Sequence, residues 1–195
     1  MEKNDQDEGL SLTHMAVTMA ILLGVMWAIE VVDFVATSGG LDQLGIRPRT
    51  QSGLWGILRA PFLHAGWQHL SANSVPFVVL GLLVLLRGFR DFLGSTLIII
   101  VLGGSGVWLF GQSNSVHVGA SGLIFGYFGF LVVIGILERS LVGVMTSALV
   151  VFLYGGIIWG VLPTTSYVSW EGHLFGLLAG TMAAKWMGKK KKESD

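Results

Sequence analysis

The stretch HVGASGLIFGYFGFLVVIGIL, residues 117–137, is apolar enough to cross a membrane, yet it opens with a serine between two small residues, Ala120 and Gly122. A serine in a buried helix can donate a hydrogen bond to the carbonyl four residues earlier. A serine can also act as a nucleophile when a neighbouring base takes its proton. The rest of the chain has to decide between these two interpretations of Ser121.

The composition is that of an integral membrane protein. Of 195 residues, 52% are hydrophobic and only 12% are charged, and the mean hydropathy is +0.70. A soluble domain carries about 25% charged residues. The absence of cysteine excludes disulfides, thiolate catalysis and cysteine-based metal sites. Basic residues are sparse outside the lysine run 189–192, which argues against a nucleic-acid partner.

Six segments are apolar over the roughly 20 residues that a membrane helix needs. The predicted spans are 14–36, 69–86, 92–110, 118–137, 141–162 and 171–187. We therefore expect an all-α integral membrane protein, a six-transmembrane-helix bundle at 14–187, with a short cytosolic tail at 1–13 and a basic cytosolic tail at 188–195. The first apolar block is longer than a signal-peptide core and lacks a small-residue cleavage site, so we interpret it as a retained span.

Charge sets the expected orientation. The lysines at 189–192 flank the last span, so the positive-inside rule places both termini in the cytoplasm. The expected location is the cell membrane, plasma or inner. The short hinges 87–91 and 138–140 then lie in the cytoplasm as well. The outer segment 37–68 is long for a compact bundle and rich in Trp, Phe and Leu. We expect it to lie in the membrane interface.

Four polar residues enter their spans from the outer side: Ser121, His173, His69 and Asn73. Their three spans run in the same direction, so the four side chains should share one depth near the outer surface. His69 and Asn73 are four residues apart and share a helix face. Ionisable residues in a membrane are costly and mark functional sites. This convergence predicts a site that opens to the outer face.

Glycines should bring two of these spans together. They recur at three- and four-residue intervals in the fourth and sixth spans, at Gly122, Gly126, Gly129, Gly172, Gly176 and Gly180. Small residues at such spacing let membrane helices approach to backbone contact. If the two spans pack through these glycines, Ser121 and His173 are drawn together. An imidazole could then take the hydroxyl proton, while Asn73, His69 and the Ser121 amide are candidate oxyanion donors.

The motifs resemble those of the rhomboid intramembrane serine proteases over nearly the whole chain. GASG at 119–122 resembles the nucleophile motif of the family, HLSAN at 69–73 its His-x-x-x-Asn, and GHLFGLLAG at 172–180 its histidine followed by Gly-x-x-x-Gly. PFLHAGWQHL at 61–70 resembles the end of its interfacial first loop. The motifs occur in order and on the expected spans.

The resemblance implies a Ser121–His173 dyad without a catalytic acid. It also implies an oxyanion hole formed by His69, Asn73 and the backbone amides of Ala120 and Ser121. The substrates would be transmembrane segments of other membrane proteins, cut near the outer boundary, with the lipid bilayer as surroundings and without a cofactor, metal or nucleic acid. One departure is Phe125, which stands one turn after Ser121, where some members have a tyrosine.

Other polar residues receive structural interpretations. We expect His64 to bond within the first loop, His117 to make a loop contact, and Glu30 and Asp33 to bond loop amides or mark the end of the first span. The fifth span, which carries Trp159 near its outer end, is our candidate for a lateral gate.

Two rival functions compete with the protease. A non-catalytic rhomboid-like protein would bind membrane helices without cutting them. A metal-dependent protein could use the outer histidines His64, His69, His117 and His173. Against the metal-dependent protein, the sequence contains no His-Glu-x-x-His pattern and no carboxylate spaced to act as its base.

A third alternative is a channel or transporter. It would require charged groups at mid-span, which spans two to six essentially lack.

Overall fold

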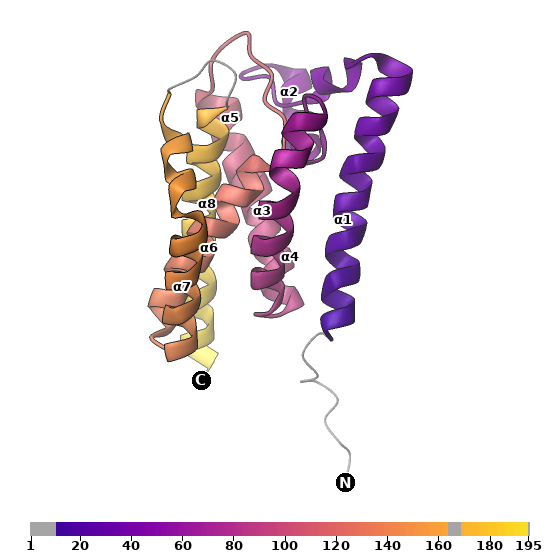
Figure 1. Ribbon diagram of the computed structural model, residues 1–195. Helices are drawn as coiled ribbons and strands as arrows, with labels where there is room; N and C mark the ends of the chain where they lie inside the picture. The colour runs from indigo at the N-terminus through magenta and orange to yellow at the C-terminus, as the bar shows by residue number, and fades with distance from the viewer. Residues whose placement is uncertain (1–10, 164–168, 195) are drawn as a thin grey trace.

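A computed structural model describes residues 11–163 and 169–194, with side chains up to residue 188. Within those ranges the fold is helical, and the extended pairing is limited to one antiparallel bridge between Ile46 and His117. The α-helices are α1 Leu12–Val32, α2 Gln51–Arg59, α3 Trp67–Leu85, α4 Phe89–Ile98, α5 Gly104–Phe110, α6 Ser121–Glu138, α7 Leu141–Tyr154 and α8 Trp170–Ser194 (Figure 1). Shorter helical turns are η1 Asp33–Thr37, η2 Gly40–Leu44, η3 Ala60–Phe62, η4 Ile99–Gly103 and η5 Gly155–Val161.

Five helical segments of the described chain are long and apolar enough to cross a membrane: Leu12–Thr37, Trp67–Leu85, Phe89–Phe110, Ser121–Glu138 and Leu141–Val161. They correspond to the first five predicted spans, and the expected all-helical membrane bundle is confirmed at that level. Helix α8 has 25 residues. Glu171, His173 and Lys185 lower its hydropathy, which separates it from the other five.

Two spans depart from the straight helices that hydropathy suggests. The third is divided by the π-helical turn η4 between α4 and α5, and the first continues past α1 into the π-helical turn η1. The fourth begins at Ser121 and not at residue 118, because Gly119 has φ of +113°, outside the helical region. A π-turn changes which residues face the bundle, and periodicity in the sequence does not reveal it.

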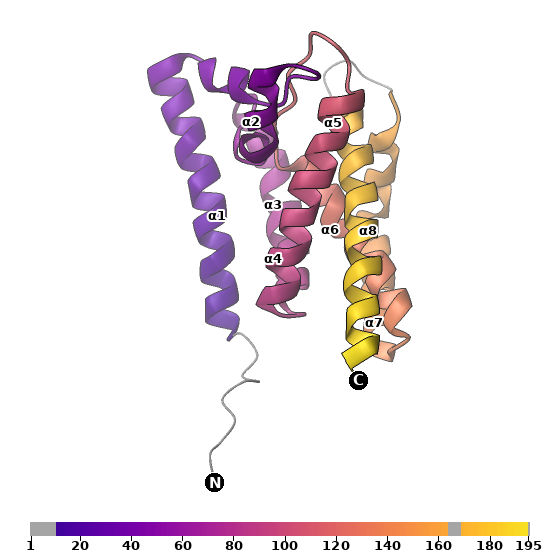
Figure 2. The same cartoon turned by 180° about the vertical axis from the view of Figure 1, so that it is seen from behind.

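Helix α6 is the centre of the bundle. It contacts α3, α4, α7 and α8, while α1 stands at one edge and packs on α3 (Figures 1 and 2). The core is apolar and includes Leu70, Phe77, Phe130 and Leu131, all nearly inaccessible. Inside it, the buried Tyr127 hydroxyl lies 2.7 Å from the Thr96 hydroxyl, so each polar group has a partner.

The end of the bundle opposite the start of α1 and the end of α8 is covered by η2, α2 and η3 (Figure 1). Thr50 caps α2, and Leu54, Trp55 and Leu58 leave an apolar exposed face on it. This agrees with an interfacial location for the first loop. Arg49 fastens the loop to the bundle by donating to the Leu109 and Gly111 carbonyls at the end of α5.

The other end carries the charged hinges. Arg87 donates two hydrogen bonds to the Glu138 carboxylate, at 3.0 Å and 2.6 Å, and forms an ion pair of 3.4 Å with Asp91. Such a bidentate pair is stronger and more directional than a simple ion pair. It ties the turn after α3 to the end of α6.

Candidate active site

Ser121 is the first residue of α6, and its placement depends on the turn before it. Gly119 adopts φ of +113°, and a β-carbon there would lie 2.6 Å from His69 Cε1 and 3.4 Å from Asn73 Nδ2. Glycine is the residue that tolerates both this conformation and this close approach. The turn therefore brings the backbone just before Ser121 against the two polar side chains of α3.

His173 of α8 lies on the same face of α6 as Ser121. Its imidazole stacks on the Phe125 ring with a centroid distance of 4.1 Å and an interplanar angle of 7°. Phe125 is four residues, about one turn, after Ser121. The Ser121 hydroxyl makes no hydrogen bond with any residue in the described ranges.

The orientation of the His173 ring is set by η5, the helical turn that follows α7. His173 Nδ1 lies 2.8 Å from the Gly160 carbonyl oxygen, an acceptor, so Nδ1 carries the proton and donates it. In the neutral ring, Nε2 then has the free lone pair. Gly160 also has to be small, because a β-carbon there would lie 2.9 Å from Phe125 Cζ and 3.0 Å from His173 Nδ1.

Glycines bring α6 and α8 into backbone contact. A β-carbon on Gly176 would overlap the Gly122 carbonyl oxygen, and one on Gly180 would overlap the Gly126 carbonyl oxygen. At the end of the contact nearest Ser121, the position of a Gly122 β-carbon lies 3.5 Å from the Gly172 carbonyl oxygen. We call this contact, formed by Gly122, Gly126, Gly172, Gly176 and Gly180, the glycine seam. It fixes the spacing of Ser121 and His173.

His69 and Asn73 offer hydrogen-bond donors beside the Gly119 turn. The Ala65 amide donates to His69 Nδ1 at 3.3 Å, which leaves Nε2 of the neutral ring as the protonated nitrogen. Asn73 Nδ2 is buried and has no partner among the described residues. A buried donor without a partner is uncommon, and this one is free to donate to a further group.

His64 contacts the segment just before Ser121, and not only its own loop as expected. Its ring is almost fully buried, and Nε2 accepts a hydrogen bond of 3.2 Å from the Ala120 amide. Burial, helped by the nearby His69, lowers the pKa of His64 to about 4, which keeps the ring neutral. The Ala120 amide was a candidate oxyanion donor, and this bond already uses it.

Two carboxylates considered in the sequence bond to loop amides. Glu171 accepts a hydrogen bond of 3.2 Å from the Gln112 amide, and Asp33 accepts one of 2.8 Å from the Leu41 amide, as expected for a loop contact. No group of three or more His, Cys, Asp or Glu side chains in residues 11–163 and 169–188 is placed to hold a metal. His64, His69, His117 and His173 therefore do not form a shared ligand set.

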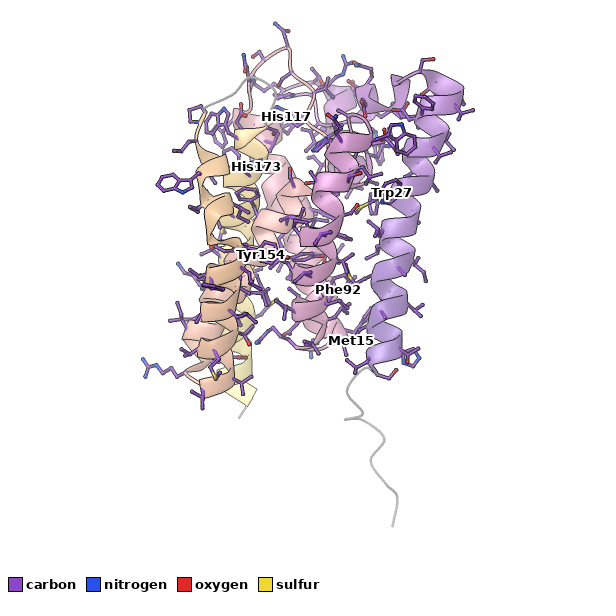
Figure 3. The ribbon with its side chains drawn as sticks, in the orientation of Figure 1. Met15, Trp27, Phe92, His117, Tyr154 and His173 are labelled. Carbon is purple, nitrogen blue, oxygen red and sulfur yellow. The ribbon has the colours of Figure 1, made fainter. Side chains whose placement is uncertain are left out.

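His117 links two loops beside the site. Its ring lies 2.6 Å (Nδ1) from Ser169 Oγ and 2.8 Å (Nε2) from Ser115 Oγ. Figure 3 shows His117 and His173 near the same end of the bundle. A cavity of about 50 Å³ is lined by Ser121 and by residues that include His117, Ser169 and Gly172. That space is large enough for water.

Two partners of the site could not be found from the sequence. Gly160 acts through its backbone carbonyl, which every residue possesses, and Ser169 lies in a polar stretch without a recognisable motif. Both come into contact with the site only through the path of the chain between α7 and α8. The sequence offered one hint of the contact at Gly160, the three glycines at 155, 156 and 160 in η5.

Comparison of the sequence with known proteins shows the family to which the chain belongs. A model of the Rhomboid domain matches residues 51–190. An uncharacterised protein of Mycobacterium tuberculosis is 43% identical over 175 residues, covering 86% of this chain and 72% of the relative. A Bacillus subtilis protein named "Putative rhomboid protease YdcA" is 29% identical over 146 residues, covering 71% and 69%. Rhomboid-like protein 11, chloroplastic, of Arabidopsis thaliana is 32% identical over 150 residues, covering 69% and 52%. The chain belongs to the rhomboid family.

Proposed function

We propose that this rhomboid-family chain is an intramembrane serine endopeptidase with Ser121 as nucleophile and His173 as general base. The observation that carries the proposal is the orientation of His173. Its ring is stacked on Phe125 below Ser121, with the Nδ1 proton held by the Gly160 carbonyl and Nε2 left to accept a proton. A serine hydroxyl becomes a nucleophile when such a base is within reach.

The proposed reaction follows from these groups. Ser121 Oγ attacks the scissile carbonyl while His173 Nε2 takes the hydroxyl proton. The imidazolium returns that proton to the leaving amine, and an acyl ester of Ser121 remains. A water molecule, activated by the same Nε2, then releases the new carboxyl end. The cavity lined by Ser121 is large enough to hold water for this second step, which supports the proposal.

Three donors are candidates for the oxyanion site. They are the His69 Nε2 proton, the Asn73 amide group without a partner, and the Ser121 amide at the start of α6. The first amides of a helix lack intrahelical acceptors, and the helix dipole favours negative charge there. Because the Ala120 amide already donates to His64, we leave it out of the proposed set.

We propose α8 as the sixth membrane span, with both termini in the cytoplasm and the site opening to the outer face of a cell membrane. The arginine hinges and the terminal lysine run lie at one end of the bundle, which fits the positive-inside rule. The substrates would be transmembrane segments that unwind near the outer boundary, since a helical peptide bond is shielded by its own hydrogen bonds.

The test is cleavage of a fluorogenic transmembrane substrate by the full chain in liposomes, with labelling by a fluorophosphonate as a second readout. Ser121→Ala and His173→Ala should reduce cleavage to background and keep the melting temperature. His14→Ala, an exposed histidine at the far end, and Ser52→Ala, an exposed serine of α2, are the matched controls and should behave as the parent.

Each rival predicts a different result. A helix-binding protein without catalysis would bind the substrate segment but neither cut it nor react with the phosphonate at Ser121. A metal-dependent enzyme would lose activity with a chelator and keep it in Ser121→Ala. Either result would overturn the serine protease.

A further inference from the structure

A short hydrogen bond joins the chain segments that precede the proposed nucleophile and the proposed base. His117 Nδ1 lies 2.6 Å from Ser169 Oγ. His117 stands four residues before Ser121, and Ser169 stands four residues before His173. The bond therefore spans the two chain segments from which the reacting side chains project.

Both ends of this bond are anchored. The His117 amide donates to the Ile46 carbonyl at 2.9 Å, and the Ile46 amide donates to the His117 carbonyl at 3.0 Å. Ser169 Oγ accepts from the Gly172 amide at 3.1 Å, and the Ser169 carbonyl accepts from the His173 amide at 3.2 Å. Ser169 thus caps α8, and His117 is held by the first loop, so their bond connects two fixed points.

The hydrogen-bond pattern assigns the ring protons. Ser115 Oγ donates to the Gln112 carbonyl at 2.6 Å, so the same oxygen accepts from His117 Nε2 at 2.8 Å. Nδ1 is then the acceptor for the Ser169 hydroxyl proton. Burial lowers the pKa of His117, and the negative charge of Glu171 opposes this in part. The neutral ring is the form that satisfies every partner.

Packing alone does not set the spacing of the two segments. The cavity beside Ser121 is also lined by His117, Ser169 and Gly172. Side chains therefore leave space between the segment before Ser121 and the segment before His173. Well-packed interiors have few voids of this size. The glycine seam holds α6 against α8 within the bundle. In the loops the two segments are linked by the His117–Ser169 bond and by the Gln112 amide, which donates to the Glu171 carboxylate.

We propose that His117 is a positioning residue that fixes the approach of the Ser121 segment to the His173 segment through its bond to Ser169. The proposal rests on the proposed function. His117 does not touch the reacting atoms in this role. It limits how far the Ser121 segment and the His173 segment can move apart.

Two substitutions separate the two bonds of the ring. An asparagine at 117 can place its amide oxygen near the Nδ1 position and keep the Ser169 bond, whereas a glutamine can reach only the Nε2 position and keep the Ser115 bond. We expect His117→Gln to lower kcat by about 10- to 100-fold with little change in KM, since small misplacements at a reacting centre have effects of that size. His117→Asn should stay within about threefold of the parent.

Fluorophosphonate labelling of Ser121 gives a readout that needs no peptide substrate. Its rate should fall with kcat in His117→Gln and stay near the parent in His117→Asn. Both variants lose one ring bond, so their melting temperatures should be similar. If both variants lose activity equally and in step with their melting temperatures, His117 is merely structural and the proposal is wrong.

The bond is also tested from its other end. Ser169→Ala should lower kcat, and it should add little further loss in the His117→Gln background, because both changes remove the same bond. Ser140→Ala is the matched control. Ser140 caps α7 by accepting from the Gly143 amide at 3.0 Å, as Ser169 caps α8, but it does not contact His117. Additive losses, or equal losses of activity in Ser140→Ala, would overturn the proposal.

The two levels of the argument fail differently. If Ser121→Ala retains cleavage and labelling, the serine protease itself is wrong. If Ser121 is required but His117→Gln and Ser169→Ala both turn over and label at the parent's rate, only the positioning role is wrong.

Discussion

Helix α6 has two neighbours that it contacts in different ways. Against α8 it forms the glycine seam, in which backbone meets backbone from Gly122 to Gly180. Against α7 the close contact lies toward the hinge end, where a β-carbon on Gly135 would overlap Ser147 Oγ and the Gly143 carbonyl oxygen. Farther along, Phe152 and Trp159 are 85% and 70% exposed. The side of the site formed by α8 is held by backbone contact over several turns, whereas η5 meets the site at Gly160, beside Phe125 and His173.

This difference fits a division of work between the two neighbours. The proposed base has to keep its distance from Ser121, so its helix is interlocked with α6 along several turns. A transmembrane substrate has to reach Ser121 sideways from the lipid, so one wall has to be able to yield. We propose α7 with η5 as that wall, the gate expected from the sequence.

The largest effect is expected for Gly180→Ala. The new methyl group would overlap the Gly126 carbonyl oxygen, and because this is backbone, the helices have to separate. We expect the free energy of unfolding, measured by SDS titration in mixed micelles, to fall by about 3 kcal/mol, the upper part of the range for overpacking. Cleavage should fall with it.

Gly24→Ala is the control for the seam. A β-carbon on Gly24 of α1 has no heavy atom within 4 Å. Alanine is the better helix former, so this variant should be as stable as the parent or slightly more so. Equal destabilisation by both substitutions would show that the seam contact is not what makes Gly180 sensitive.

A smaller loss of stability is expected for Gly135→Ala at the α6–α7 contact. Part of the overlap is with Ser147 Oγ, a side-chain atom that can rotate, and part is with the Gly143 carbonyl. We expect a loss of about 1–2 kcal/mol in the same SDS titration. A loss as large as that of Gly180→Ala would remove the contrast between the two neighbours.

Gly160→Ala should affect catalysis and leave stability nearly unchanged. The added carbon would lie 3.0 Å from His173 Nδ1 and displace the imidazole, but η5 has no buried residue in its length. We expect kcat to fall about tenfold, which corresponds to about 1.4 kcal/mol in the barrier. Gly156→Ala, in the same turn with no heavy atom within 4 Å of its β-carbon, should cleave like the parent. Identical kinetics of the two variants would contradict the role of Gly160.

The smallest effect is expected for Ser147→Ala. Its hydroxyl lies 3.1 Å from the Leu131 carbonyl of α6, so it donates across the helix pair. Hydrogen bonds between membrane helices contribute about 0.6 kcal/mol on average. Thr146→Val, which removes a hydroxyl bonded only within α7, should cost less. If the two losses are the same, the interhelical bond adds nothing to the hinge-end contact.

The sequence predicted the features that depend on side-chain type. The apolar blocks marked the membrane helices, and the glycine spacing indicated which helices would meet. The bonds of Gly160, Ala120 and Ser169 were not predictable, because two of them use backbone groups that every residue carries. The start of α6 was placed three residues early, since the positive φ of Gly119 depends on the His69 and Asn73 side chains packed against it.

The glycine seam can form only late in the synthesis of the chain. Ser121 and the glycines of α6 leave the ribosome about 50 residues before His173, because chains are made from the N-terminus onward. Until α8 has inserted, the proposed nucleophile has no base and the small-residue face of α6 has no neighbour. If Ser121 and His173 act as proposed, a partly made chain cannot cut the proteins around it. The proposed activity would begin only when α8 closes against α6.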